Sequence, residues 1–382
     1  MENRNPEFSR RKFVKILGSS GAMLVLNPYF SWTLNEQEID PRVIEIVKRT
    51  IGIDTHNHVD VPLVTSQLPG PKVDLAGEMK KSGLSAIAMT FAVDYQKLTK
   101  EGEAYERFLN GLSAVDAILK ANGMKRALNL RDIEKAHKSQ KPTVIQSVEG
   151  GHFLEGKIER LQVAYDRGLR HLGLLHDNDA SVVLGDIYTN PVKREGLTQF
   201  GSDVIRESEK LGILIDLAHC DDDTVNAALK VAKNPVLISH TGLDTRLGQN
   251  ENFAKMMKPR LIAKEQAKIV ADKGGVIGVW THLAENPTVF ADNVRAMVDV
   301  VGVEHVSIGT DTKMTPAYHA PDSNFKNQGE RAGERTNSAW EKSNGGFYYT
   351  VVEALLKAGF NEPEIAKIGG GNYCRLFDAA TK

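Results

Sequence analysis

The chain has 382 residues, with 48 Lys and Arg against 49 Asp and Glu, so its net charge is −1. That balance gives no reason to expect nucleic acid or a charged membrane surface as a partner. A hydrophobic content of 41% and a charged content of 25% are those of a globular protein. Its two cysteines, Cys220 and Cys374, exclude a disulfide framework, and we expect both to be free thiols.

Residues 1–35 are predicted to be a leader rather than part of the fold. Ser9-Arg10-Arg11-Lys12-Phe13-Val14-Lys15 precedes a short apolar run, Ile16–Leu26, that glycine and serine interrupt. This run is too short to cross a membrane. The paired arginines resemble the twin-arginine export signal of bacteria, and an amphipathic basic helix is the alternative.

We therefore expect the twin-arginine export machinery to be a partner and the location to be periplasmic or otherwise extracytoplasmic. No Ala-x-Ala site follows the leader, so its cleavage point stays open. A retained leader would act as a membrane anchor.

Residues 36–382 repeat a pattern of apolar strand, polar loop and amphipathic helix, after an opening polar helix at Glu36–Arg49. The predicted strands are Ile51–Thr55, Ser85–Phe91, Thr143–Val148, His171–Leu175, Ile213–Ala218, Val236–Ser239, Val276–Trp280 and His305–Gly309. The predicted helices are Tyr105–Ala121, Ile158–Arg167, Phe200–Lys210, Asp223–Ala232, Ala263–Lys273, Val289–Val301 and Phe347–Ala358, with a last one from Pro363 leading into Gly369–Phe377.

This alternation predicts a single α/β domain, a (β/α)₈ TIM barrel with loop insertions. A doubly wound open sheet is the alternative, but no Gly-x-Gly-x-x-Gly motif follows the first strand. The polar stretch Lys313–Gly346 is expected to be a long loop after the eighth strand.

The first strand leads into a cluster of polar residues, His56, His58 and Asp60. Because side chains alternate along a strand, His56 and His58 point to the same face. Two imidazoles at the C-terminal end of a strand could hold one metal ion, provided that other segments supply more ligands.

Other predicted strands also end in residues that bind metals or carry protons. The set comprises Glu149, His176, His219, His240 and Asp311. Six strands that end this way are hard to explain by packing, because the interior of a barrel favours Val, Ile and Leu, and the active site of such a barrel lies where the strands end. The five histidines and two carboxylates suit zinc or a similar divalent ion and suffice for two ions.

Several other polar residues are not expected to bind the metal themselves. His152 is expected to be structural or to support a ligand, and Asp54 to support His56. His171 is expected at the opposite end of the barrel, and Asp177 at the rim of the substrate site. His282 follows the seventh strand and could line the pocket, although we favour a role outside it.

The motifs, taken in order, resemble the membrane (renal-type) dipeptidase family, peptidase family M19, a branch of the amidohydrolase-like metal-dependent barrels. They are Asp54-Thr55-His56-Asn57-His58, Glu149-Gly150-Gly151-His152, Leu174-Leu175-His176-Asp177-Asn178, Gly196-Leu197-Thr198-Gln199-Phe200-Gly201, Leu211–His219, Pro235–His240, Ile308–Asp311 and Gly370–Phe377. Together they extend from Ile51 to Phe377.

The resemblance implies a site with two divalent ions, most plausibly Zn²⁺. His56 and His58 would hold the first ion, His219 and His240 the second, and Glu149 would bridge them. Asp311 would contact the first ion and transfer the proton of the bridging water. His176 would polarise the scissile carbonyl, and Arg260 would receive the substrate carboxylate, with Arg246 as the alternative.

Two departures from the family pattern lie near the substrate. The family usually has Asp where this chain has His58, and Phe-Asp-Gly where it has Thr312-Lys313-Met314. We expect an exported zinc dipeptidase that cleaves dipeptide amide bonds with a metal-activated water. Whether the protein forms a homodimer is left open. The alternatives are a related metallohydrolase that cleaves another amide, lactam, lactone or ester, and a catalytically silent barrel that binds a metal or ligand.

Overall fold

The computed structural model describes residues 39–95, 98, 100–188, 196–319, 331–341 and 345–382. Residues Ile39–Lys382 form one compact unit. The predicted leader at residues 1–35 lies outside the described residues, so its role remains a prediction. Among the helices of the described residues, none is both long and apolar enough to cross a membrane.

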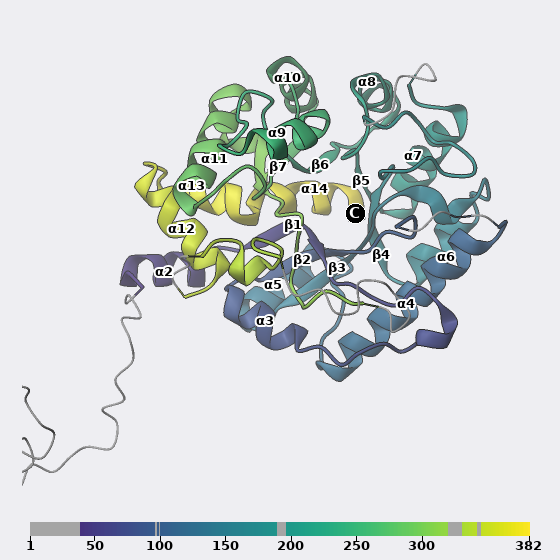
Figure 1. Ribbon diagram of the computed structural model, residues 1–382, viewed down its shortest axis with the longest axis horizontal. Coiled ribbons are helices and arrows are strands. Elements are labelled where there is room, and N and C mark those ends of the chain that lie inside the picture. The colour runs from purple at the N-terminus through teal and green to yellow at the C-terminus, as the bar shows by residue number, and fades with distance from the viewer. Residues whose placement is uncertain (1–38, 96–97, 99, 189–195, 320–330, 342–344) are drawn as a thin grey trace, which may run out of the picture. The chain divides into compact units, whose positions relative to one another are not determined.

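Eight parallel strands close into a barrel with helices around it (Figure 1). The strands are β1 (Ile53–His58), β2 (Ala86–Thr90), β3 (Thr143–Val148), β4 (Leu169–Gly173), β5 (Leu214–Asp216), β6 (Leu237–Thr241), β7 (Val276–Val279) and β8 (Val306–Ile308). Neighbouring strands pair along the chain from β2 to β8. The barrel closes through β1, which pairs with both β2 and β8. The predicted (β/α)₈ barrel is thereby confirmed.

One helix precedes the first strand, and the others connect the strands or follow the last one. They are α2 (Pro41–Arg49), α3 (Leu75–Ser82), α4 (Glu103–Ala121), α5 (Leu130–Lys138), α6 (Arg160–Asp166), α7 (Gln199–Leu211), α8 (Asp222–Val231), α9 (Glu251–Met257), α10 (Lys264–Asp272), α11 (Pro287–Val301), α12 (Phe347–Lys357), α13 (Glu362–Ala366) and α14 (Asn372–Thr381). Helices α3, α5 and α9 were not predicted, because segments of two turns show too few repeats of the helical period.

Local sequence explains where these helices begin and end. Thr198 accepts a hydrogen bond from the amide of Gly201 at the start of α7, and Gly212 ends that helix at φ +86°. Asn286 caps α11, where Pro287 takes the first helical position. Such caps satisfy amides and carbonyls that a helix end leaves without partners.

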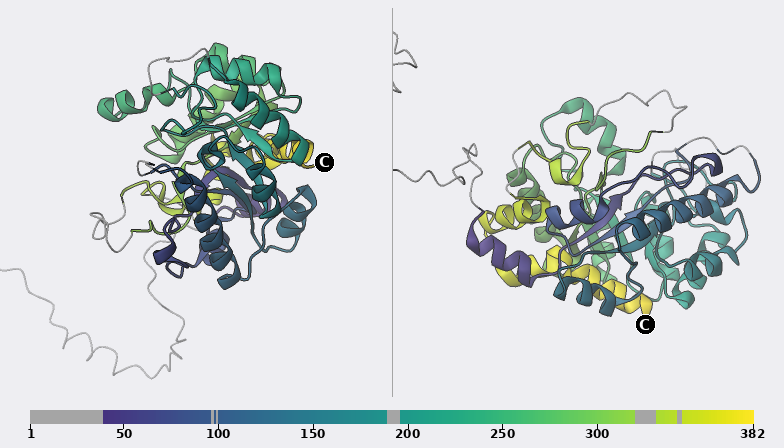
Figure 2. Two further views of the ribbon diagram at one scale, coloured as in Figure 1. Left: turned by 90° about the vertical axis from the view of Figure 1, so that its right-hand side faces the viewer. Right: turned by 90° about the horizontal axis from the view of Figure 1, so that it is seen from below.

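The C-terminal helix α14 closes the N-terminal end of the barrel. Tyr373, Leu376 and Phe377 pack against the first residues of several strands, among them Ile53 in β1 and Leu237 in β6. In the right-hand view of Figure 2 this yellow helix runs along the lower edge of the molecule and ends at the C-terminus. Because the strands are all parallel, their polar C-terminal ends meet at the opposite end of the barrel.

Close backbone contacts bring β1, β6 and β8 together beneath those polar ends. The Thr55 hydroxyl donates to the carbonyls of Ser239 (2.7 Å) and Ile308 (2.9 Å). A Cβ atom at Gly278 or Gly309 would overlap the Ser239 carbonyl, so glycine is required at both positions. This packing holds His56 beside His240, with ring centroids 4.0 Å apart.

Two details differ from the predicted elements. The chain after β8 is not all loop, because β9 (Thr312–Lys313) pairs in parallel with Asn57 and His58 of β1. His171 is the third residue of β4 rather than its first, and it lies fully buried between Asp216 and Tyr373.

Candidate metal centre

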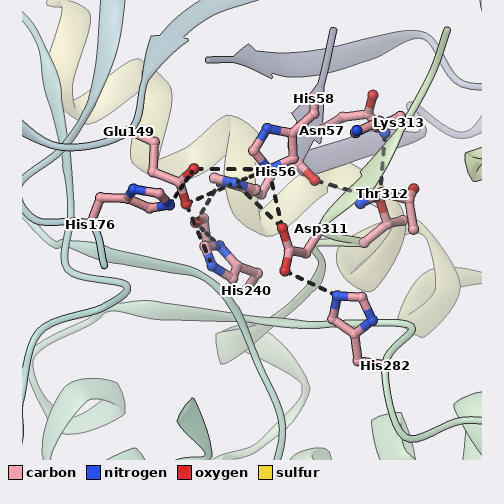
Figure 3. A network of polar contacts seen from close by, with 12 residues as sticks. His56, Asn57, His58, Glu149, His176, His240, His282, Asp311, Thr312 and Lys313 are labelled. Atoms are coloured by element: carbon pink, nitrogen blue, oxygen red, sulfur yellow. Dashed lines mark hydrogen bonds and ion pairs between the residues drawn. The ribbon is translucent and has the colours of Figure 1, made fainter. Parts of the chain in front are cut away.

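All seven predicted strand-end residues meet at the C-terminal end of the barrel (Figure 3). His56 and His58 lie in β1 and His240 in β6, and the others follow their strands directly or within a few residues. Among the described residues, three groups place their ligand atoms within 4.8 Å of one another: His56, Glu149 and His240; His56, His58 and Asp311; Glu149, His176 and His219.

Glu149 is the centre of this arrangement. Its Oε1 lies 2.8 Å from Nε2 of His219 and 3.2 Å from Nε2 of His56. Its Oε2 lies 3.4 Å from Nε2 of His176, although no hydrogen bond satisfies that oxygen. A buried carboxylate that reaches both groups of imidazoles suits the bridging position.

The other predicted carboxylate ligand, Asp311, lies on the β1 side. Its Oδ1 is 3.2 Å from Nε2 of His58 and 3.9 Å from Nε2 of His56. Opposite, Nε2 of His240 lies 3.0 Å from Nε2 of His219. The two pairs predicted for the two ions are therefore present, and His176 is also near enough to Glu149 and His219 to be a ligand.

Every histidine of the cluster turns Nε2 inward because a second group holds its Nδ1. Nδ1 of His176 donates to Asp94 at 2.6 Å, and Nδ1 of His58 lies 3.2 Å from the Tyr95 hydroxyl. The Ser239 hydroxyl lies between Nδ1 of His56 (3.3 Å) and Nδ1 of His240 (2.9 Å). These partners fix ring orientation and leave Nε2 free to accept a cation.

On His219 this supporting role is shared by two groups. Its Nδ1 lies 2.6 Å from the hydroxyl of Tyr188 and 3.2 Å from Oδ1 of Asp177. Burial alone would lower the pKa of His219, but the carboxylates of Asp177 and Glu149 raise it to about 10. Burial and the neighbouring His56 lower the pKa of His240 to about 3.

The donor set fits divalent cations. Burial opposes ionisation of Glu149 and Asp311, yet the surrounding imidazoles hold the pKa of both carboxyls well below the usual value. Facing imidazole nitrogens and a carboxylate oxygen without a hydrogen-bond partner are satisfied together when a cation lies among them. Imidazole and carboxylate ligands suit zinc.

Backbone strain is concentrated at this end of the barrel. Of the five non-glycine residues with positive φ in the described part of the chain, His219 (+67°) and Asp311 (+55°) belong to the cluster, and Leu283 (+60°) adjoins His282. Such conformations persist where surrounding contacts enforce them, as at functional sites.

Arg260 and Arg246 have different surroundings. Nη2 of Arg260 donates to Oδ2 of Asp177 at 2.9 Å, and its guanidinium lies 5.3 Å from the centre of the Tyr188 ring. Arg246 donates to Asn293 on α11 instead. Through Asp177, Arg260 is thus connected to His219.

Sequence reasoning missed the partners that support the cluster and undervalued His282. Nε2 of His282 lies 3.0 Å from Oδ2 of Asp311. Asp94, Tyr95, Tyr188 and Ser239 carry no signal of their own in the sequence, because each contacts at least one histidine that lies in another segment of the chain. His152 borders the cluster, where Nε2 lies 2.7 Å from the Asn178 carbonyl.

Two cavities border the cluster. The larger, of about 1530 Å³, is lined on its inner side by His58, His282 and Asp311. The smaller, of about 340 Å³, is lined by His219, His240 and Arg260. One part of the cluster therefore borders a wide cleft, and another part borders a small pocket with a guanidinium in its wall.

Several solved structures share the fold. An amidohydrolase from Pseudomonas aeruginosa superposes with a TM-score of 0.70 at 21% identity, covering 89% of this chain and 99% of the other. The probable dipeptidase PvdM from the same organism gives 0.69 at 16%, covering 89% and 98%. A metallo peptidase from Rhodobacter sphaeroides, liganded with a phosphinate mimic of the dipeptide L-Ala-D-Ala, gives 0.61 at 16%, covering 87% and 99%.

Among curated proteins, the chain is 26% identical over 266 residues to Dipeptidase 3 of Macaca fascicularis and, over the same length, to that of Homo sapiens. Each alignment covers 65% of this chain and 47% of the relative, so the chain spans about half the length of the curated relatives it matches. The family model of membrane dipeptidase (Peptidase family M19) matches residues 41–322. That match covers well over half of the sequence and shows that the chain belongs to the membrane dipeptidase family.

Proposed function

We propose that this protein is a dipeptidase-type metallohydrolase that uses two divalent ions, with zinc as the expected metal. The observation that carries the proposal is the central position of Glu149, whose carboxylate lies within 4.0 Å of Nε2 of all four histidines assigned to the two ions: His56, His58, His219 and His240. When bound, divalent ions would polarise a carbonyl and lower the pKa of water toward about 7. His56, His58, Glu149, His219, His240 and Asp311 would hold them.

The remaining steps follow from the positions of the side chains. Asp311 would accept a proton from the attacking water and pass it to the leaving amine. His176, held by Asp94, would stabilise the negative charge that develops on the carbonyl oxygen. Arg260 would exchange its contact with Asp177 for the substrate carboxylate, which a guanidinium binds with two parallel hydrogen bonds.

The test is amino-acid release from a panel of dipeptides by protein stripped of metal and reloaded with zinc. We expect turnover together with about two bound ions per chain. Asp311→Asn should lose most of the turnover, because an amide cannot carry the proton. If the reloaded protein binds two ions and cleaves no dipeptide or other amide, the proposal is wrong.

We also propose export by the twin-arginine route, supported by Arg10-Arg11-Lys12-Phe13 near the N-terminus. Fractionation of cells that produce the chain and its Arg10→Lys/Arg11→Lys variant tests this step. We expect the unaltered chain outside the cytoplasm and the double variant inside it. Equal distribution of the two would contradict the proposal.

A further inference from the structure

The larger cleft has a greater volume than a dipeptide would fill. Its volume is about 1530 Å³, whereas pockets for drug-sized ligands measure about 300–1,000 Å³. A dipeptide is smaller than most such ligands, and only its acyl half would enter this cleft if its carboxylate bound Arg260. The cleft therefore has room for a much larger acyl portion.

The wall of the cleft contains a set of large apolar side chains among its polar residues. Leu63, Val64, Phe91, Phe253, Leu283 and Trp340 line it. Val64 is 45% exposed and is one of few large apolar side chains that the described part of the chain leaves so accessible. Covering this surface with an alkyl chain would be favourable, because each methylene removed from water adds to binding.

Different residues of the cluster line the cleft and the small pocket, which gives the substrate a direction. Arg260 in the small pocket fits the carboxylate of the leaving amino acid. The carbonyl to be attacked would then lie at the cluster, and the acyl chain would extend past His58 and His282 into the cleft.

A lysine lies in the wall of the cleft close to the cluster. Lys313 lines the cleft, and β9 holds it opposite His58 in the sheet. Its Nζ donates to Oδ2 of Asp60 (2.9 Å) and lies 3.1 Å from Oε1 of Glu334. Asp60 and Glu334 are therefore already paired with Lys313, and the ammonium group of a dipeptide would have to compete with the lysine for them.

We propose that the preferred substrate is an N-acyl amino acid, with a long apolar acyl chain in the cleft and a free carboxylate at Arg260. This inference rests on the proposed function, because it assumes amide hydrolysis at the cluster. Water adds its oxygen to the acyl carbon, the carbon–nitrogen bond breaks, and the nitrogen receives the proton. The products are a fatty carboxylate and a free amino acid.

A substrate series with one leaving group tests the inference in the zinc-loaded protein. N-acetyl-, N-butanoyl- and N-octanoyl-leucine are compared with alanyl-leucine, each with L- and D-leucine. We expect kcat/KM to rise at least about ten-fold from acetyl to octanoyl, since each added methylene contributes in an apolar pocket. We also expect octanoyl-leucine to exceed alanyl-leucine.

The outcomes separate this inference from the function on which it rests. Faster cleavage of alanyl-leucine, or no gain with chain length, would overturn the inference and leave metal-dependent amide hydrolysis intact. Absence of hydrolysis of every substrate by protein that holds two ions would overturn both.

A matched pair of variants locates the acyl site. Val64→Glu places a charge in the cleft, and we expect it to reduce the ratio of octanoyl to acetyl kcat/KM at least about five-fold. Val163→Glu alters a valine that is 39% exposed on α6, outside the cleft lining, and should leave the ratio unchanged. Equal ratios in the two variants would contradict the assignment. Matching melting temperatures would show that both variants are folded.

Discussion

Nε2 of His282 lies 3.0 Å from Oδ2 of Asp311, the carboxylate whose other oxygen faces His58. The ring of His282 is held edge-on against Trp280 (centroids 5.2 Å apart) and Phe253 (6.0 Å). The candidate proton carrier Asp311 is thereby fixed between an imidazole of the cluster and an imidazole of the cleft wall.

Replacement of His282 should therefore affect turnover more than metal binding. In His282→Ala we expect kcat to fall about 10- to 100-fold, because Asp311 loses the contact that orients it, while the number of bound ions stays the same. His305→Ala, which alters a histidine bonded to the Gly275 carbonyl, is the control. A loss of bound metal in His282→Ala would assign His282 to the ligands instead.

The hydroxyl of Tyr95 should strengthen metal binding through His58. Tyr95→Phe removes the group 3.2 Å from Nδ1 of His58, so we expect zinc affinity, measured by competition with a chelator, to fall about ten-fold. Tyr318→Phe is a matched control from the same cleft, because its hydroxyl donates to Gln67 rather than to a histidine. Equal affinities of the two variants would contradict the role of Tyr95.

Removal of metal should destabilise the fold. The cluster gathers two buried carboxylates with depressed pKa values among imidazoles, an arrangement that a cation stabilises. With free zinc at about 100 times its Kd, we expect roughly 2.7 kcal/mol of added stability from mass action alone. Calorimetry with zinc and with chelator measures the difference, and Glu149→Gln should abolish most of it. An unchanged melting temperature on chelation would count against the site.

The buried carboxylate of Asp216 should make stability depend on pH in the metal-free protein. Its Oδ1 accepts from the amides of Ser239 (2.9 Å) and Ala218 (3.0 Å), and its Oδ2 from Nε2 of His171 (3.2 Å). Burial would raise the pKa of Asp216, but the hydrogen bond and charge of His171 hold it below its usual value.

The sign of the effect follows from that depressed pKa. Unfolded Asp has a pKa near about 3.9, so the stabilisation from Asp216 is fully present above that value and is lost as the pH falls through it toward the lower folded pKa. Asp216→Asn should be destabilised by about 2–4 kcal/mol at pH 7 and should lose less stability than the parent between pH 6 and pH 3. Denaturant titrations at each pH measure this. If the free energy of unfolding changes with pH in the same way in both proteins, Asp216 is not the group responsible.

Arg260 should determine the affinity for a substrate carboxylate. Arg260→Met is expected to raise KM about 10- to 100-fold for a substrate with a free carboxylate and much less for its amide. Arg246→Met, which alters an arginine bonded to Asn293, should leave KM near that of the parent. The reverse pattern would transfer the role to Arg246.

Several of these relationships could be predicted from sequence because they depend on local order. Alternation along β1 places His56 and His58 on one face, and their Nε2 atoms lie 3.3 Å apart. The alternation of strands and helices indicates a barrel, and a barrel brings the C-terminal ends of all its strands to one place. The seven residues of the cluster were therefore recognisable, although β9 and the short helices α3, α5 and α9 were not.

The sequence by itself thus determined the barrel and the identity of the residues gathered at its C-terminal end, because both follow from short-range periodicity. Only the tertiary structure decided how those residues are held, since the supporting contacts join distant segments: Asp94 to His176, Tyr188 to His219, and Ser239 to His56. It also decided the position of Lys313, which pairing of β9 with β1 places at the wall of the cleft. Side-chain hydrogen bonds between distant segments depend on how the strands pack, and packing leaves no periodic trace in the sequence.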